Sequence, residues 1–358
     1  MSRGIRARID RSALKHNLAL ARELAPQSRV IAVIKADGYG HGMLEVARSL
    51  NDADAFAVES AEGGVKLREA GIEKEILLLS GFHEEGDIDG IAQWRLSPVI
   101  HDHWQVAALS RGESREAVSI WIKIDSGMHR VGFDPEAFSQ VLQALESLSN
   151  VRITGLMSHL ANADDLSNSA TRDQCRRFLE VAGDRSYPLS LANSPGVLGW
   201  PETHLDWIRP GMMLYGCSPM KDRSEADLGL RPAMSLEARI IAIKHVVQGE
   251  AIGYGSTWAC DSPTRVGVLA CGYGDGYPRH APSGTPVWVK GSPGRTLGRV
   301  SMDLMSIDLS GCEDARPGDW VELWGANVTA STVAKHAGTI PYELVTRVTS
   351  RVPRIYAS

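Results

Sequence analysis

The sequence predicts an α/β fold in which an N-terminal (β/α)8 barrel, a TIM barrel, is followed by a mostly-β C-terminal domain. Short apolar runs alternate with amphipathic segments over the first part of the chain, which is the pattern of repeated β-then-α units. The pattern changes after a polar, acidic and glycine-containing stretch at 221–229. We therefore divide the 358 residues into two domains, 1–225 and 226–358.

Eight short apolar runs in the first domain are predicted to be strands, and amphipathic segments between them to be helices. The strands are 29–34, 55–58, 75–79, 96–100, 118–124, 152–157, 187–191 and 205–208, and the helices include 43–51, 61–71 and 135–148. Repeated β-then-α units predict a parallel sheet, and eight such units fit a closed barrel. An open, doubly wound sheet is the competing interpretation.

The second domain shows a different pattern, with short apolar segments separated by glycine and proline turns. Predicted strands are 238–247, 265–269, 286–289 and 321–323, and a predicted helix covers 329–338. These features predict a domain that is mostly β.

Polar residues follow five of the predicted barrel strands: Lys35, Lys123 with Asp125, His159, Asn193 with Ser194, and Arg209. In a barrel, the carboxyl ends of the strands meet at the face where active sites are built. A single polar residue at such a position is ordinary, but five strands that end this way indicate a site.

Composition excludes several classes of function. A formal net charge of −5 argues against nucleic acid or an anionic membrane as the partner. We expect no membrane span, since no apolar stretch is long enough, and no signal peptide. The five cysteines have neither disulfide-framework nor zinc-ligand spacing, so we expect a cytoplasmic protein without a bound metal.

The run RVIAVIKADGYGHG at 29–42 carries the strongest chemical signal. Lys35 comes directly after a buried apolar strand, where an ammonium is costly unless it is paired or loses its proton. A neutral lysine amine is also the nucleophile of Schiff-base chemistry. The three glycines after it allow the backbone to approach a ligand closely, and Tyr39 between them is free to donate to a phosphate.

In this segment the sequence resembles the alanine racemase family of fold-type III enzymes, which use pyridoxal 5′-phosphate (PLP). The resemblance extends roughly from residue 5 to residue 356. It passes through KIDSGMHRVG at 123–132, SHLANAD at 158–164, ANS at 192–194, IRPGMMLYG at 208–216, IGYGS at 252–256, CGYGDGYPR at 271–279, GRVSMD at 298–303 and YELVTR at 342–347. Motifs in this order across both domains are far more specific than any one of them.

The resemblance implies a two-base racemisation of alanine. Lys35 is implied to hold PLP and to exchange the substrate Cα proton on one face, while Tyr254 exchanges it on the other. A free tyrosine titrates near ~10, so a tyrosine that acts as a base needs a site that favours its phenolate.

Further cofactor contacts are implied at matching positions. Arg209 is implied to face the pyridine nitrogen, and its permanent charge keeps that nitrogen unprotonated. His159 is implied to orient Arg209. The implied phosphate donors are the hydroxyls of Tyr39, Ser194 and Tyr342 and the backbone N–H groups of Gly211 and Met212, at the start of a short helix.

Arg130 is implied to contact both the phenolic oxygen of the cofactor and the substrate carboxylate. Further substrate contacts are implied at the Met302 backbone N–H and at Asp303. Lys123 matches a position that is often carbamylated, which gives Arg130 a negative partner. The positions implied to line a narrow approach to the site are Asp164, Tyr273, Arg279, Arg299 and Ile340.

The second domain of one subunit is implied to complete the site of the other, so we expect a homodimer with shared active sites. A broad-specificity amino-acid racemase shares nearly all these residues. A decarboxylase of the same fold type is expected to place an acidic group, not Arg209, at the pyridine nitrogen. A non-catalytic PLP-binding protein leaves Tyr254 and the second domain without a purpose.

Each motif alone also has a structural interpretation. Lys35 fits a turn with a solvated lysine, and Tyr254 fits a turn with a packed aromatic ring. His159 and Lys123 fit ordinary buried residues. The sequence departs from the family pattern at Ser301, where cysteine is frequent, and at Thr346; neither position depends on a unique functional group.

Overall fold

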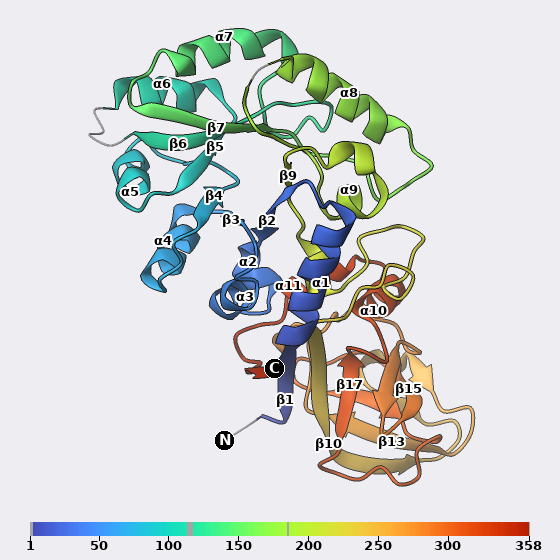
Figure 1. The fold of residues 1–358 in the computed structure, drawn as a ribbon. Coiled ribbons are helices and arrows are strands. Elements are labelled where there is room, and N and C mark those ends of the chain that lie inside the picture. The colour runs from blue at the N-terminus through green and yellow to red at the C-terminus, as the bar shows by residue number, and fades with distance from the viewer. Residues whose placement is uncertain (1–2, 113–116, 185, 358) are drawn as a thin grey trace.

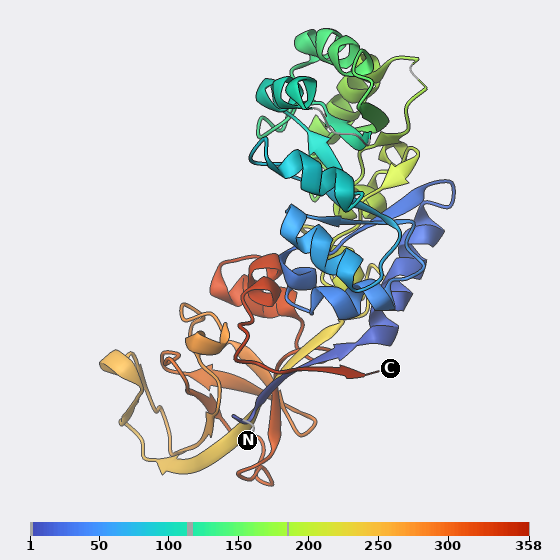
Figure 2. The same cartoon turned by 90° about the vertical axis from the view of Figure 1, so that its left-hand side faces the viewer.

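The computed structural model describes residues 3–112, 117–184 and 186–357 and divides into a barrel and a β domain joined end to end (Figures 1 and 2). The barrel is closed, because its first strand pairs in parallel with both the second and the last. In order its strands are β2 (Arg29–Val33), β3 (Ala55–Val58), β4 (Glu75–Leu78), β5 (Ser97–Ile100), β6 (Val118–Lys123), β7 (Val151–Met157), β8 (Leu189–Ser190) and β9 (Trp207–Ile208). The predicted barrel is confirmed, and the open sheet is excluded.

Helices cover the outside of the barrel, because parallel strands need crossover connections and both faces of the sheet must be buried. They are α1 (Arg11–Leu24), α3 (Met43–Ser49), α4 (Ala61–Glu69), α5 (Asp87–Gln93), α6 (His103–Arg111), α7 (Pro135–Glu146), α8 (Ala170–Ala182) and α9 (Ser194–Gly199). Asp10 fixes the start of α1, where its carboxylate accepts from the backbone N–H groups of Ser12 and Ala13.

The β domain is built on an eight-stranded sheet in the order β13-β16-β15-β14-β17-β10-β1-β18. The strands are β1 (Ile5–Asp10), β10 (Met234–Val246), β13 (Thr264–Leu269), β14 (Pro286–Val289), β15 (Ser292–Leu297), β16 (Met305–Asp308), β17 (Trp320–Trp324) and β18 (Arg354–Ala357). Two short strands, β11 (Ala251–Ile252) and β12 (Trp258–Ala259), pair separately, and α10 (Ala330–Ala337) and α11 (Pro341–Thr346) follow β17.

Strand β1 belongs to the sheet of the β domain although it comes first in the chain. It pairs antiparallel with β10 and parallel with β18 (Figure 1). Its sequence, IRARID, alternates apolar and charged residues, and Ile5, Ala7 and Ile9 are fully buried. The chain therefore starts in the β domain, enters the barrel through α1 and returns to the β domain along β10. Two chain segments thus connect the barrel to the β domain, one before its first strand and one after its last.

The segment after β2 packs closely against the C-terminal part of the chain. A short turn, α2 (Lys35–Tyr39), contacts α11. Gly40 has φ +79, and a Cβ there would lie 2.0 Å from the carbonyl oxygen of Val345, so only glycine fits. This contact brings residues of α11 to the mouth of the barrel.

Among the described residues, no helix is long and apolar enough to cross a membrane.

Candidate active site

A cavity of about 690 Å³ opens at the carboxyl ends of the barrel strands. This volume is in the range of small-molecule and cofactor sites. The predicted site residues that line it are Lys35, Tyr39, Lys123, Arg130, His159, Ser194, Arg209, Gly211, Met212, Ile340 and Tyr342. The barrel residues in this group lie at the ends of barrel strands or in the segments that follow them, while Ile340 and Tyr342 come from the start of α11.

Lys35 starts the turn α2, separated from the end of β2 by Ile34 alone. Its Nζ lies 3.2 Å from Oε2 of Glu59, and its side chain is 39% exposed, so the ammonium is paired at the cavity rather than buried alone. The next two residues, Ala36 and Asp37, have φ values of +50 and +55, which are strained for residues with a Cβ. This left-handed turn ends β2 abruptly and presents the lysine to the cavity.

Glu59 is a cavity residue that the sequence reasoning missed. It directly follows β3, as Lys35 nearly follows β2, so the same rule about polar residues at strand ends identifies it. Ser80, beyond β4, donates a hydrogen bond to its carboxylate. Burial opposes ionisation of Glu59, but the Ser80 hydroxyl and the Lys35 ammonium outweigh it and lower the carboxyl pKa.

Arg209 lies at the base of the cavity, directly after β9, and is almost completely buried. Its guanidinium donates to Oγ of Ser190 at 2.7 Å and to the backbone carbonyls of Ser158 and Leu191. Burial lowers the pKa of Arg209 to about 10, which still leaves it charged at neutral pH. These partners are all neutral, so the positive charge is available to the cavity.

His159 contacts Arg209, with its Nδ1 3.5 Å from a guanidinium nitrogen. Burial, and then the charge of Arg209, lower the pKa of His159 well below its usual value. The imidazole is therefore neutral at pH 7, and its Nδ1 is able to accept from the guanidinium.

Ser194, Tyr39, Tyr342 and Gly211 converge at one end of the cavity. The Ser194 Oγ accepts from the backbone N–H of Gly211 at 2.8 Å, and the ring of Tyr39 lies 6.2 Å from that of Tyr342. A Cβ on Gly211 would lie 2.7 Å from the Tyr39 hydroxyl, so glycine permits this approach. Burial raises the pKa of Tyr39 to about 12, and burial also raises that of Tyr342, so both hydroxyls stay protonated and able to donate.

Lys123, at the end of β6, is the second lysine in the cavity and is almost completely buried. Burial, followed by the charges of Arg209 and Arg130, lowers its pKa to about 8. An appreciable fraction of this amine is therefore neutral at physiological pH.

The cavity has an excess of positive charge. Four cationic side chains line it, against the two carboxylates of Glu59 and Glu343. The cationic residues are Lys35, Lys123, Arg130 and Arg209. This charge, the hydroxyl donors and the lysine amine fit an anionic ligand that carries both a phosphate and a carbonyl group, which are the features of PLP.

The remaining predicted site residues do not line this cavity. Tyr254, Met302, Asp303, Tyr273, Arg279 and Arg299 lie on loops of the β domain. Tyr254 and Met302 are 69% and 53% exposed. Asp164 lies between β7 and α8 and does not line the cavity either.

The β-domain residues are themselves gathered into neighbouring loops. Arg299 packs beside the turn that carries Tyr254, and the guanidinium carbon of Arg279 lies 6.0 Å from the ring centre of Tyr273. The chain therefore presents two groups of predicted site residues, one around the barrel cavity and one on the exposed surface of the β domain. Among the described residues, no cluster of three or more His, Cys, Asp or Glu is arranged to hold a metal ion.

Comparison with known proteins places both domains in one family. The family models described as "Alanine racemase, N-terminal domain" and "Alanine racemase, C-terminal domain" match residues 9–219 and 233–356. The alanine racemase of Halorhodospira halophila is 48% identical over 356 residues, with 99% of this chain and 98% of that protein covered.

Solved structures agree. The biosynthetic alanine racemase of Pseudomonas aeruginosa superposes with a TM-score of 0.97 at 46% identity, and 100% of both chains is covered. The alanine racemase of Acinetobacter baumannii superposes with a TM-score of 0.92 at 36% identity, covering 99% of both chains. These matches span both domains and the order of the elements, and the chain therefore belongs to the alanine racemase family.

Proposed function

We propose that this protein is a PLP-dependent enzyme that interconverts L-alanine and D-alanine with two bases. The observation that carries the proposal is the barrel cavity, which combines a lysine amine at its mouth with the buried guanidinium of Arg209 at its base. Relatives of nearly full-length similarity are named alanine racemase, which supports alanine as the substrate.

The residues that would hold PLP are those of the cavity. Lys35 would bind it covalently, Arg209 would face its ring nitrogen, and Arg130 would lie beside the phenolic oxygen. The phosphate would accept from Tyr39, Ser194, Tyr342 and the backbone N–H groups of Gly211 and Met212. When bound, PLP supplies an electron-withdrawing system that acidifies the Cα–H bond of the amino acid.

The protein's own groups then decide the reaction. Lys35 Nζ takes or returns the Cα proton on one face, and Tyr254 Oη does so on the other. Glu59, paired with Lys35 at 3.2 Å, holds the amine at the cavity mouth. Because Arg209 stays charged, it disfavours a second positive charge on a nearby ring nitrogen, which suits proton exchange better than decarboxylation.

Tyr254 is proposed to act in the site of a second subunit. In this chain it is 69% exposed and does not line the cavity that holds Lys35. A two-fold homodimer places the β domain of each subunit over the barrel of the other, which supplies both bases to each site. Met302, Tyr273, Arg279 and Arg299 would reach the same site and narrow it around a methyl side chain.

Lys123 is proposed to be carbamylated. Carbamylation requires a neutral amine, and burial has lowered the pKa of this one to about 8. The product is an anion, which would pair with the Arg130 guanidinium and relieve the crowding of positive charges in the cavity.

We also propose that the protein acts in the cytoplasm, where it either supplies D-alanine for peptidoglycan or takes part in the degradation of alanine. A broad-specificity racemase is the alternative, because Arg209, Lys35 and Tyr254 would serve it equally. An alanine racemase and a broad-specificity racemase would differ at the approach lined by Ile340, since a wider opening admits larger substrate side chains.

The proposal is tested by following deuterium at Cα when protein loaded with PLP is given L-alanine in D2O. We expect deuterated D-alanine from the wild type and strongly reduced formation in Lys35→Ala and Tyr254→Phe. Absence of exchange in wild-type protein that has bound PLP would contradict the proposal. A panel of other L-amino acids in the same assay distinguishes the broad-specificity alternative.

A further inference from the structure

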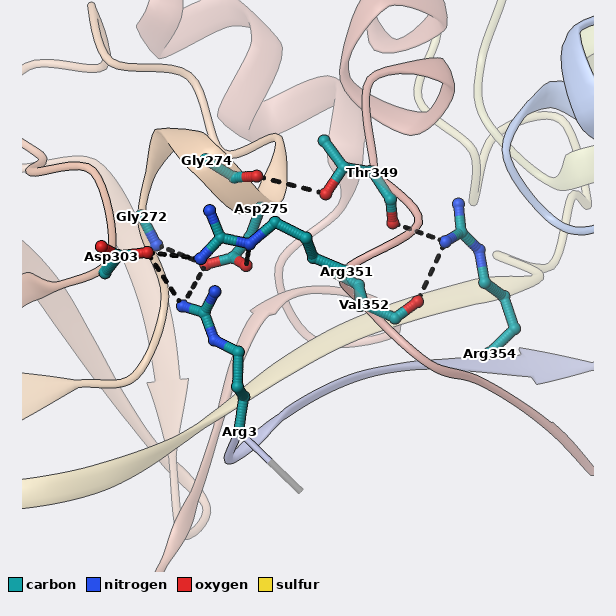
Figure 3. Close-up of polar contacts among 9 residues, drawn as sticks. All are labelled: Arg3, Gly272, Gly274, Asp275, Asp303, Thr349, Arg351, Val352 and Arg354. Carbon is teal, nitrogen blue, oxygen red and sulfur yellow. Dashed lines mark hydrogen bonds and ion pairs between the residues drawn. The ribbon is translucent and has the colours of Figure 1, made fainter. Parts of the chain in front are cut away.

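Four charged residues form a closed ion-pair cluster at the edge of the β domain (Figure 3). A guanidinium nitrogen of Arg3 lies 3.3 Å from Asp275 Oδ2 and 3.2 Å from Asp303 Oδ1. Nε of Arg351 lies 3.4 Å from Asp275 Oδ1, and its terminal nitrogen forms a close ion pair with Asp303. Each arginine thus bridges both carboxylates, and the two positive charges balance the two negative ones.

Asp275 anchors the cluster, because its side chain is completely buried. It also accepts from the backbone N–H of Gly272 at 3.1 Å, which closes the loop 272–275 on itself. Burying a carboxylate costs free energy unless it is paired and hydrogen-bonded. The ion pairs with both arginines therefore stabilise this conformation of the loop.

The cluster holds together the two loops that carry Tyr273 and Met302. The backbone N–H of Tyr273 donates to the carbonyl of Ser301 at 3.0 Å, and that of Gly274 donates to the carbonyl of Met302 at 2.8 Å. A Cβ on Gly272 would lie 2.3 Å from the Met302 carbonyl, so the two backbones are in direct contact. Moving either loop therefore moves the other.

A third segment fixes this pair of loops to the rest of the chain. Thr349 donates through its backbone N–H to the carbonyl of Asp275 at 3.1 Å and through its hydroxyl to that of Gly274 at 3.2 Å. Arg354 in turn donates to the carbonyl of Thr349 at 2.6 Å and to that of Gly40 at 3.1 Å (Figure 3 shows the bond to Thr349). The contacts thus run from the loop after Lys35 to the ion-pair cluster.

We propose that Arg3, Asp275, Asp303 and Arg351 are positioning residues that hold Met302 and Tyr273 in place for binding of the substrate, an inference that rests on the proposed function. The carboxylate of Asp303 is engaged by two arginines, and a free carboxylate there would repel a substrate carboxylate. Asp303 therefore acts through the position of the neighbouring Met302 backbone N–H and not through its own side chain.

The test is the steady-state kinetics of the PLP-loaded enzyme with L-alanine for Arg351→Ala, Arg3→Ala and Asp275→Asn. We expect KM to rise by about tenfold, while kcat changes by less than about threefold, because the displaced loops carry binding groups and neither Lys35 nor Tyr254. Arg351→Lys should raise KM less than Arg351→Ala does. The lysine ammonium restores the positive charge, but it lacks the planar guanidinium that contacts both carboxylates.

The matched control is Arg295→Ala, which breaks a 3.1 Å ion pair with Asp308 between β15 and β16 and should leave KM unchanged. A KM within twofold of the wild type in both Arg351→Ala and Arg3→Ala would overturn the proposal, as would an equal rise in Arg295→Ala or a fall in kcat alone. If Asp275→Asn does not fold, the partly exposed Arg3 and Arg351 variants decide the question. Racemisation by the wild type is measured first, so failure of the proposed function is seen separately.

Discussion

The barrel cavity and the β-domain surface carry equally specific motifs but differ in how complete they are. Around the cavity, the polar groups already have partners: Arg209 donates to neutral acceptors, and Lys35 is paired with Glu59. On the β domain, Tyr254 and Met302 project with more than half of their side-chain surface exposed. In the proposed enzyme, the groups around the cavity and the exposed groups of the β domain would form the two halves of one site, which neither region supplies alone.

The difference follows from how each region is stabilised. The cavity residues sit at the ends of strands that are buried on both faces, so barrel packing fixes them. The β-domain residues sit on loops, which the fold supports through hydrogen bonds between loops and through the cluster of Arg3, Asp275, Asp303 and Arg351. The second region therefore depends on local polar contacts for its geometry, and in the proposed dimer the partner subunit would cover it.

Lys35→Ala gives the largest expected effect, because it removes the group that would bind PLP and one of the two bases. We expect racemisation to fall by about 10⁴-fold or more. The absorbance band of bound PLP should also be lost, while the thermal midpoint of the PLP-free protein should change little because the side chain is 39% exposed. Lys66→Ala, which removes a surface lysine paired with Glu62 at 2.6 Å, is the control and should retain full activity.

Tyr254→Phe should lower racemisation by roughly 10²- to 10⁴-fold, the usual worth of a positioned acid or base. Uptake of PLP should be unchanged, because Tyr254 does not line the barrel cavity. Exchange of the Cα deuteron of one enantiomer without inversion is the signature to look for by NMR. Tyr187→Phe serves as the control, because it removes a tyrosine hydroxyl that donates a hydrogen bond to Glu146 and does not line the cavity. Equal losses in both variants would refute a catalytic role for Tyr254.

Lys123→Met should stabilise the protein in CO2-free buffer, by up to roughly 3 kcal/mol. The folded pKa, about 8, lies below the unfolded value of 10.5, so below pH 8 the wild type bears the full cost of a buried charge. Between pH 8 and 10.5 the folded state loses its proton first, and the advantage of the methionine variant shrinks. Urea unfolding across this pH range measures the difference in free energy of unfolding between the two proteins. If Lys123 is carbamylated, added bicarbonate should reduce this difference at pH 7.5.

Ile340→Ala gives the smallest expected effect. Ile340 lines the cavity mouth and is 59% exposed, so truncation should widen the approach without unfolding the protein. We expect the ratio of kcat/KM for alanine over valine to fall by about three- to tenfold. Ile241→Ala, an exposed isoleucine on β10, is the matched control. An unchanged ratio in Ile340→Ala would remove this residue from the determinants of specificity.

Much of the fold was predictable because buried parallel strands are continuous apolar runs. All eight barrel strands were predicted from such runs, and 55–58 agrees with β3 at both ends. Strand β1 was missed, although IRARID alternates clearly, because a pattern read along the chain does not show that its partners β10 and β18 lie more than 200 residues later.

The cavity was also largely predictable, since polar residues after buried strands converge in a barrel. Glu59 was missed although it obeys the same rule, because it belongs to no motif that the resemblance supplied. The ion pairs of Arg3 were not predictable at all. They join residues separated by about 270 to 300 positions, and only the folded sheet brings these residues together.

The most direct test of the shared site is to mix Lys35→Ala and Tyr254→Phe subunits, each inactive alone. If Tyr254 serves Lys35 of the partner subunit, unfolding and refolding the mixture creates mixed dimers in which one site has both bases intact. Random pairing then restores about a quarter of wild-type activity. If both bases belong to one chain, every site in the mixture lacks one of them, and activity stays at the level of the separate variants.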